Sequence, residues 1–208
     1  TQVTRLHDWG DDDFSKPLET ILEITGKLYG GNSQALTAIV GGIINVLSTR
    51  LFIADNLKNY PEILDNPLVK PLFVAGLPRT GTTMMHRLIA SDKRWRVLQY
   101  WELLFPYRRR EVPDFDRQAL MLAEQSVRQI NSQNPEFMKR HEMKATSPEE
   151  CFNILRLSFR SISWGNELYS PEYIDWYSKQ DMTGSYRFYK KVLKLQLWRK
   201  SADHLLLK

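Results

Sequence analysis

The chain has 208 residues, which suits one folded domain with a core of its own. Its 29 basic and 24 acidic side chains leave a net charge of +5. This modest excess favours an anionic ligand and would also suit weak nucleic-acid binding, but no stacked-aromatic RNA motif or zinc-finger spacing accompanies it, so we expect no nucleic-acid partner. The single cysteine, Cys151, excludes an intramolecular disulfide and predicts a reducing, cytoplasmic location.

The first 66 residues are predicted to form a helical cover. Ser33 is expected to cap a long helix that runs toward Leu57. The most apolar part of that helix, residues 35–47, is shorter than the ~20 residues of a membrane span and contains threonine, glycine and asparagine, so we expect a buried helix and no stable membrane insertion. An earlier helix, ending at Gly30-Gly31, is predicted by apolar residues at helical spacing, namely Leu18, Ile21, Leu22 and Leu28.

The stretch PLFVAGLPRTGTTMMHRLIASD, residues 71–92, predicts a strand, a tight loop and a helix. The apolar run 72–75 is typical of a parallel strand that is covered on both faces, and helical spacing begins at Thr82. The N-terminus of the helix then faces the loop, where its N–H groups and dipole favour an anion. Gly76 and Gly81 allow the backbone to approach that anion closely.

The loop differs from a nucleotide-hydrolysing loop at one position. Its spacing, Gly76-x-x-x-x-Gly81, matches the Walker A pattern, but Thr82 stands where that pattern has its lysine. The missing lysine argues against ATP or GTP hydrolysis. Arg79 supplies a cation inside the loop instead, and its planar guanidinium suits a phosphate or a sulfate.

Further elements complete an α/β fold with a parallel sheet and flanking helices. We expect a second strand over 97–100, right-handed and parallel to the first, and a third strand over 205–208. Three helices are predicted between them, over 116–132, 147–164 and 183–201. In SPEE, Ser147, Pro148 and Glu150 have the pattern of an N-cap, a first helical position and a capping box, so this helix is predicted to begin there.

Several segments in order resemble the bacterial sulfotransferase family: FVAGLPRTGTTMMHRLIASD, RWRVLQYWELLFP, HEMKATSPEECF and HLLLK. These enzymes have a P-loop-like sheet and transfer a sulfonate group from 3′-phosphoadenosine 5′-phosphosulfate (PAPS). The resemblance implies that PAPS is the donor and that no metal is needed. It also implies that the loop binds the 5′-phosphosulfate through Gly76, Leu77, Pro78, Arg79, Thr80, Gly81, Thr82 and Thr83.

The resemblance also implies catalytic residues. Tyrosylprotein sulfotransferases, which are similar, have a glutamate base in the place of Glu102, after the strand that follows the loop helix. Lys208 resembles the lysine at the end of the third strand that stabilises charge on the transferring group, although it could also be a solvated end. His141 is the alternative base, because animal cytosolic sulfotransferases use a histidine. His86 is expected to pack or to form a hydrogen bond.

In the family, a segment after the third strand carries an arginine and a serine that bind the 3′-phosphate. We therefore expect one sulfotransferase domain over 1–208 that a further segment or a further chain completes: a helical cover over 1–66, then a PAPS-binding part over 67–208 with a helical insertion over 116–204. The expected acceptor is a hydroxyl of a small molecule, lipid or glycoside. Two alternatives stay open, a P-loop nucleotide kinase or other phosphotransferase and a non-catalytic anion-binding protein that retains the loop.

Overall fold

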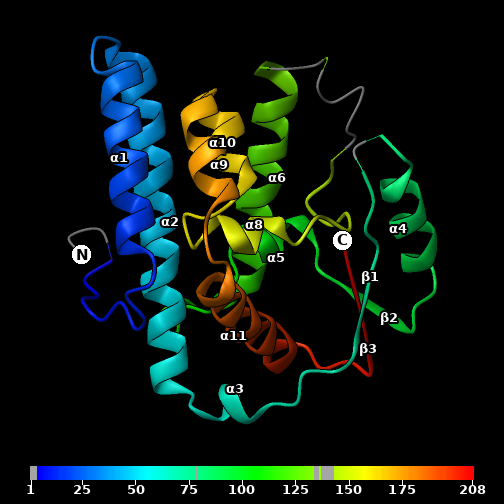
Figure 1. Cartoon of the computed structure of the whole chain (residues 1–208). Coiled ribbons are helices and arrows are strands. Elements are labelled where there is room, and N and C mark those ends of the chain that lie inside the picture. The colour runs from blue at the N-terminus through cyan, green and yellow to red at the C-terminus, as the bar shows by residue number, and fades with distance from the viewer. Residues whose placement is uncertain (1–3, 78, 134–135, 137–142) are drawn as a thin grey trace. The chain divides into compact units, whose positions relative to one another are not determined.

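A computed structural model describes residues 4–77, 79–133, 136 and 143–208 of the chain (Figure 1). Their helices and small parallel sheet confirm the predicted α/β class. The chain divides into two compact units: unit 1 comprises Thr1–Leu64 and Phe152–Leu193, and unit 2 comprises Asp65–Cys151 and Lys194–Lys208. The expected boundary at residue 66 lies close to this division, but residues 152–193, expected within the insertion, belong with the N-terminal helices.

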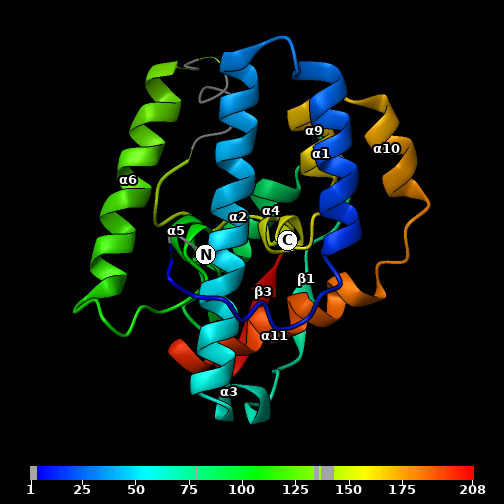
Figure 2. The same ribbon diagram turned by 90° about the vertical axis from the view of Figure 1, so that its left-hand side faces the viewer.

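Unit 1 is helical. Its two longest helices, α1 and α2, lie side by side and antiparallel in both views (Figures 1 and 2). As predicted, α1 ends at Gly30, but α2 is capped by Asn32 and not by Ser33, because the Asn32 side chain accepts a hydrogen bond of 3.1 Å from the Ala35 N–H. The helices of this unit are α1 (Ser15–Tyr29), α2 (Ser33–Asn59), α8 (Phe152–Arg156), α9 (Ile162–Leu168), α10 (Pro171–Ser178) and the first part of α11 (Thr183–Arg199).

Aromatic side chains fill the core of unit 1. Trp164 is fully buried and stacks on Phe159, with ring centroids 5.5 Å apart. The guanidinium of the buried Arg50 lies 4.1 Å from the ring centre of Phe14 and 4.3 Å from that of Phe188. These cation–π contacts hold the positive charge of Arg50 inside an otherwise apolar core.

The length of α2 contradicts the expectation that its apolar stretch is too short to span a membrane. In the part of the chain that the structure describes, α2 is the one helix that is long and apolar enough to do so: it has 27 residues, and its most apolar window reaches a mean hydropathy of 1.7. Of that window, 39% is buried inside the fold. Length and composition of this kind also occur in the core helices of soluble proteins and in signal sequences.

Unit 2 contains a three-stranded sheet in the order β1-β3-β2, with both outer strands parallel to the central one. The strands are β1 (Pro71–Phe73), β2 (Trp95–Val97) and β3 (His204–Leu207). The predicted third strand is confirmed, and its leucines 205–207 are buried. By contrast, Leu72 and Phe73 of β1, which is an edge strand of this sheet, are 41% and 53% exposed. The prediction that this strand is covered on both faces is therefore wrong for the described chain.

The segment after β2 forms a helix where a strand was predicted. β2 already ends at Val97, and Tyr100 begins the short helix α5 (Tyr100–Leu104). The reason is local, since Gln99 and Glu102 form a capping box that starts a helix at this point. The short helix α3 (Glu62–Asp65) crosses the division between the units. Unit 2 also contains α4 (Thr82–Ala90), which packs against β2 and β3, and α6 (Phe115–Gln133), which agrees with the prediction.

The predicted helix start at SPEE is wrong. Pro148 forms an antiparallel bridge with Gln99, the Ser147 carbonyl accepts from the Tyr100 N–H at 3.1 Å, and the Glu149 N–H donates to the Leu98 carbonyl at 3.0 Å. Because these backbone groups bond across to residues 98–100, they cannot form the first turn of a helix. The predicted single helix over 147–164 is instead two short helices, α8 and α9, separated by residues 157–161.

Candidate functional site

The loop between β1 and α4 has a backbone that only particular residues allow. Gly81, the N-cap of α4, has a φ of 87°, in the left-handed region that favours glycine. A Cβ atom at Gly76 would lie 2.8 Å from Thr82 Cγ2 and 2.9 Å from Thr80 Oγ1, so position 76 has no room for a side chain. The loop begins at the carboxyl end of β1, where the Val74 N–H donates to the Leu207 carbonyl at 2.9 Å. Pro78 lies outside the described residues.

Arg79 holds a strained backbone conformation in this loop. Its φ is 67°, which is unusual for a residue with a side chain and costs on the order of 1 kcal/mol or more. The side chain is exposed, and within the described residues no carboxylate or carbonyl contacts its guanidinium. The loop therefore presents an exposed cation beside the N-terminus of α4, whose Gly81 cap has no side chain to offer to the first-turn N–H groups.

Lys208 is fixed beside the same helix terminus. Its ammonium Nζ lies 2.7 Å from Thr83 Oγ1 and 2.7 Å from Glu150 Oε1, and its side chain is only 9% exposed. Its carbonyl accepts hydrogen bonds from the Cys151 N–H at 2.9 Å and from Cys151 Sγ at 2.8 Å. The alternative that Lys208 is a solvated end is therefore wrong, since the lysine is buried and joins the loop helix to the carboxylate of Glu150.

Glu102 lies in a buried ion pair. Its Oε1 is 2.5 Å from Arg96 Nη2, and its Oε2 is 3.0 Å from Arg96 Nη1 and 2.8 Å from the Gln99 N–H. The two side chains are 7% and 6% exposed, for Arg96 and Glu102 respectively. Both carboxylate oxygens thus hold Arg96 and cap α5. Nothing in the sequence identified Arg96 as the partner of Glu102.

Glu150 is the carboxylate that the structure brings to the loop. It was interpreted as part of a capping box, yet its Oε1 binds the same ammonium as Thr83 of α4. Its side chain is 33% exposed, so solvent or a ligand reaches it, in contrast to Glu102. The long-range pairing of residues 147–149 with 98–100 places Glu150 here, and no local sequence signal indicates that pairing.

His86, one of the four histidines of the sequence, lies inside the fold. His86 is 2% exposed, which confirms that it packs inside the fold. Burial and the charge of Lys208 lower the pKa of His86 below its ordinary value, so its imidazole is neutral at pH 7. His141, the alternative base, lies outside the described residues and stays a prediction.

In the residues that are described, no group of three or more histidine, cysteine, aspartate or glutamate side chains could hold a metal ion.

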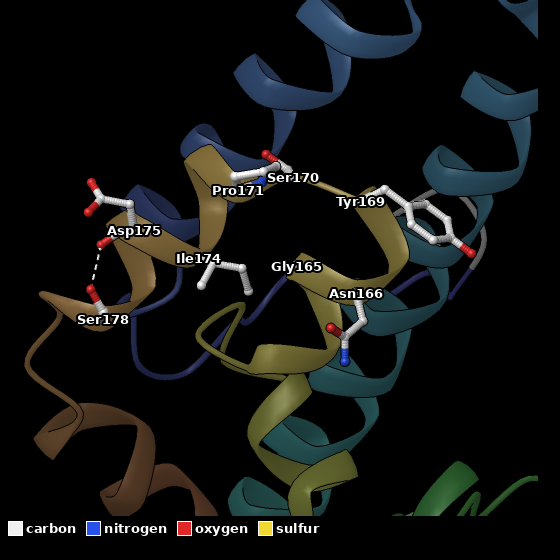
Figure 3. Close-up of a pocket in the computed structure, with 8 residues that line it drawn as sticks. All are labelled: Gly165, Asn166, Tyr169, Ser170, Pro171, Ile174, Asp175 and Ser178. Atoms are coloured by element: carbon white, nitrogen blue, oxygen red, sulfur yellow. Dashed lines mark hydrogen bonds between the residues drawn. The ribbon is translucent and has the colours of Figure 1, made fainter. Parts of the chain in front are cut away.

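A hollow of about 920 Å³ lies between α9 and α10 in unit 1 (Figure 3). The side chain of Ile174 on α10 extends toward Gly165 on α9, and the ring of Tyr169 points away from Ile174 (Figure 3). A Cβ atom at Gly165 would contact Ile174 Cδ1 and would lie 2.9 Å from Ile174 Cγ1 and 3.1 Å from Tyr173 Cδ1. The two helices thus pack closely at one edge of the hollow because residue 165 has no side chain.

Replacing Gly165 by alanine should lower the free energy of unfolding by about 1–3 kcal/mol, because the new methyl group displaces Ile174. Gly26 in α1 is the matched control, since a Cβ atom there meets nothing within 4 Å. Gly26→Ala should stabilise the protein by roughly 0.4–1 kcal/mol. Denaturant unfolding of both variants checks the pair, and equal shifts of the same sign would contradict the packing described.

Two solved structures resemble this chain over its whole length. Sulfotransferase STF1 from Mycobacterium tuberculosis H37Rv is 29% identical, with a TM-score of 0.78, and the match covers 100% of this chain and 58% of that one. Sulfotransferase STF9 from Mycobacterium avium shares the fold with a TM-score of 0.84 at 24% identity, over 100% of this chain and 54% of that one. The chain therefore spans little more than half the length of either structure. No curated protein matches it.

The model of one protein family matches most of the chain. The match extends over residues 71–206, from the first residue of β1 to Leu206 in β3. It includes the loop with Arg79, the helix α4 with Thr83, and the segment with Glu150. The resemblance of the separate motifs is therefore confirmed over more than half of the sequence, and the chain belongs to the sulfotransferase family.

Proposed function

We propose that this protein transfers a sulfonate group from PAPS to a hydroxyl of a small-molecule, lipid or glycoside acceptor in the cytoplasm. One observation carries the proposal: the Lys208 ammonium contacts Thr83 at the start of α4, next to the loop that contains the exposed Arg79. Family membership supports the same reading. Two cations and a helix N-terminus around a glycine-lined loop suit a dianionic group such as a 5′-phosphosulfate.

Each part of the loop has a role in this proposal. The missing side chain at Gly76 lets the loop close tightly, with Thr80 and Thr82 packed against its backbone. The N–H groups at the start of α4 donate to those oxygens, and Arg79 grips the sulfonate or the 5′-phosphate in a fixed orientation. Lys208 faces the oxygen between phosphorus and sulfur, where negative charge grows as the bond breaks. These positive groups come from the protein itself, so the proposed transfer needs no metal.

The proposed reaction is a single displacement at sulfur. The acceptor oxygen forms a bond to sulfur while the bond between sulfur and the bridging oxygen breaks, which leaves a sulfate ester and adenosine 3′,5′-bisphosphate. The acceptor hydroxyl gives its proton to a base as it attacks. The electron pair of the broken bond stays on the phosphate, where Lys208 and Arg79 stabilise it.

We assign the base to Glu150. It is partly exposed and shares the ammonium of Lys208 with the loop helix, which places a carboxylate next to the proposed transfer site. Glu102, the residue that the resemblance implied, is buried, and both of its oxygens already accept hydrogen bonds. A general base must reach the proton that it removes, and Glu150 meets this requirement better. His141 stays the second alternative.

A binding titration on the full-length protein tests the donor. Adenosine 3′,5′-bisphosphate is titrated against ATP with Mg²⁺ under the same conditions. The proposal predicts tighter binding of the bisphosphate, because the loop lacks the Walker A lysine at Thr82. Preference for ATP with Mg²⁺ would indicate a phosphotransferase instead, and binding of the bisphosphate without turnover on any hydroxyl acceptor would favour a non-catalytic anion-binding protein.

Arg79→Ala should weaken PAPS binding roughly tenfold or more, because it removes a charge-assisted contact worth about 1.5–3 kcal/mol. Arg117→Ala is the matched control, since Arg117 is an exposed arginine of α6 in the same unit and should leave binding unchanged. Calorimetric titration of both variants checks this prediction. Equal affinities for the two variants would mean that Arg79 does not contact the donor.

A further inference from the structure

The buried imidazole of His86 has an unusual environment. It is 2% exposed, and its Nε2 has no hydrogen-bond partner among the described residues. Burying a polar atom without a partner destabilises a fold, because the atom loses its hydrogen bonds to water. An apolar side chain at this buried position would place no polar atom out of reach of a partner. The cost needs a reason other than packing.

His86 lies on the side of α4 that meets Lys208. It follows Thr83 by three residues, so the two side chains share a face of the helix, and Thr83 binds the Lys208 ammonium at 2.7 Å. Four charges act on the imidazole: Lys208 at the end of β3, Glu149 and Glu150 on the segment before α8, and Arg87 on α4 itself. His86 is therefore part of the same polar cluster as the proposed transfer site.

Neutral histidine can give this cluster a second uncharged acceptor, beside the Thr83 hydroxyl that already accepts from Lys208. It offers one nitrogen lone pair that accepts a hydrogen bond without adding negative charge. Lys208 Nζ carries three protons, and the described contacts use two of them, one toward Thr83 and one toward Glu150. When Glu150 turns toward an acceptor hydroxyl, the ammonium loses one of these partners. A neutral acceptor would then hold the ammonium while leaving its charge available to the donor.

We propose that His86 is a positioning residue for Lys208: its Nε2 accepts a proton of the Lys208 ammonium while Glu150 acts on the acceptor. This inference rests on the proposed function. It explains the unpartnered buried nitrogen, the placement of His86 one turn after Thr83, and the use of a neutral group beside a catalytic cation. His86 itself contacts neither donor nor acceptor, so it acts on the rate through Lys208.

Two substitutions in the full-length protein test the proposal. His86→Leu fills the space but cannot accept a hydrogen bond, whereas His86→Gln keeps an acceptor oxygen at a similar distance along the side chain. We expect His86→Leu to lower kcat roughly tenfold with an unchanged KM for PAPS and an unchanged or higher melting temperature, because it removes an unpartnered polar group. His86→Gln should restore most of the rate. A merely structural role would lower the melting temperature with either variant and show no rescue.

A double-mutant cycle with Lys208→Met decides whether His86 acts through the lysine. If it does, His86→Leu should have little further effect on kcat once Lys208 is replaced. Additive losses would overturn the inference, as would a wild-type rate in His86→Leu alone. A different result would contradict the proposed function itself, namely a wild-type protein that neither binds adenosine 3′,5′-bisphosphate nor transfers a sulfonate. If the wild-type protein is active and both His86 variants keep its kcat, this inference is wrong and the proposed function is unaffected.

Discussion

Glu150→Gln in the full-length protein should lower turnover by roughly 10²–10⁴, the contribution of a general base, while PAPS affinity and stability stay close to those of the wild type. The amide keeps the size of the side chain and can still accept a hydrogen bond from Lys208 Nζ, which the carboxylate binds at 2.7 Å. It cannot take up the proton of an acceptor hydroxyl. Steady-state kinetics with one acceptor, together with a melting curve, measure the effect.

Two other residues provide the comparison. His141→Asn is measured with the same acceptor, because that histidine is the remaining alternative for the base. If His141→Asn abolishes turnover while Glu150→Gln is nearly normal, the base is the histidine and the assignment made from the contacts of Lys208 is wrong. A loss in both variants at unchanged melting temperature would mean that they act together. The corresponding substitution of Glu102 has a different expected result.

Glu102→Gln should destabilise the protein by about 3–5 kcal/mol, because it leaves the buried guanidinium of Arg96 without its counter-charge. Any fall in turnover should be no larger than the fall in the folded fraction of the protein. The double variant Arg96→Met with Glu102→Leu should recover much of the stability, since it removes both charges from the interior. Denaturant unfolding of the single and double variants measures both effects.

An exposed pair in the same unit serves as the control. Arg94 and Asp92 are 2.5 Å apart, but their side chains are 80% and 36% exposed, so Arg94→Ala should change the unfolding midpoint little. If Glu102→Gln unfolds at the wild-type midpoint and still loses turnover by 10² or more, Glu102 is catalytic after all. That result would restore the role that the resemblance to tyrosylprotein sulfotransferases implies.

The sequence was most informative where local chemistry decides the structure. The glycines of the loop, the helical spacing after Thr82 and the apolar run at 205–207 predicted the tight loop, α4 and β3. Serine caps carried a similar signal that was not used: Ser170 accepts from the Tyr173 N–H at 3.1 Å and Pro171 follows it, so the start of α10 was readable from the chain.

Prediction failed where distant segments decide the structure. Ser147, Pro148 and Glu150 have a good local pattern for a helix start, yet the backbone of residues 147–149 pairs with residues 98–100. The same long-range pairing places Glu150 near Lys208, which made its role invisible from the sequence. Glu102 was found as a residue of interest, but its buried partner Arg96 depends on how β2 and α5 fold against each other. Local propensity cannot report such contacts.

The central position of β3 affects how unit 2 forms during synthesis. β1 and β2 pair with β3 and not with each other, and Pro71 pairs with Leu205, which follows it by 134 positions. At roughly 5–20 residues per second, a ribosome takes roughly 7–27 s to add that length of chain. During this time β1 has no partner strand, and its Leu72 and Phe73 face solvent or a chaperone. We therefore expect nascent chains that stop before residue 204 to aggregate or to be held by chaperones, because β1 and β2 can pair with β3 only after it emerges.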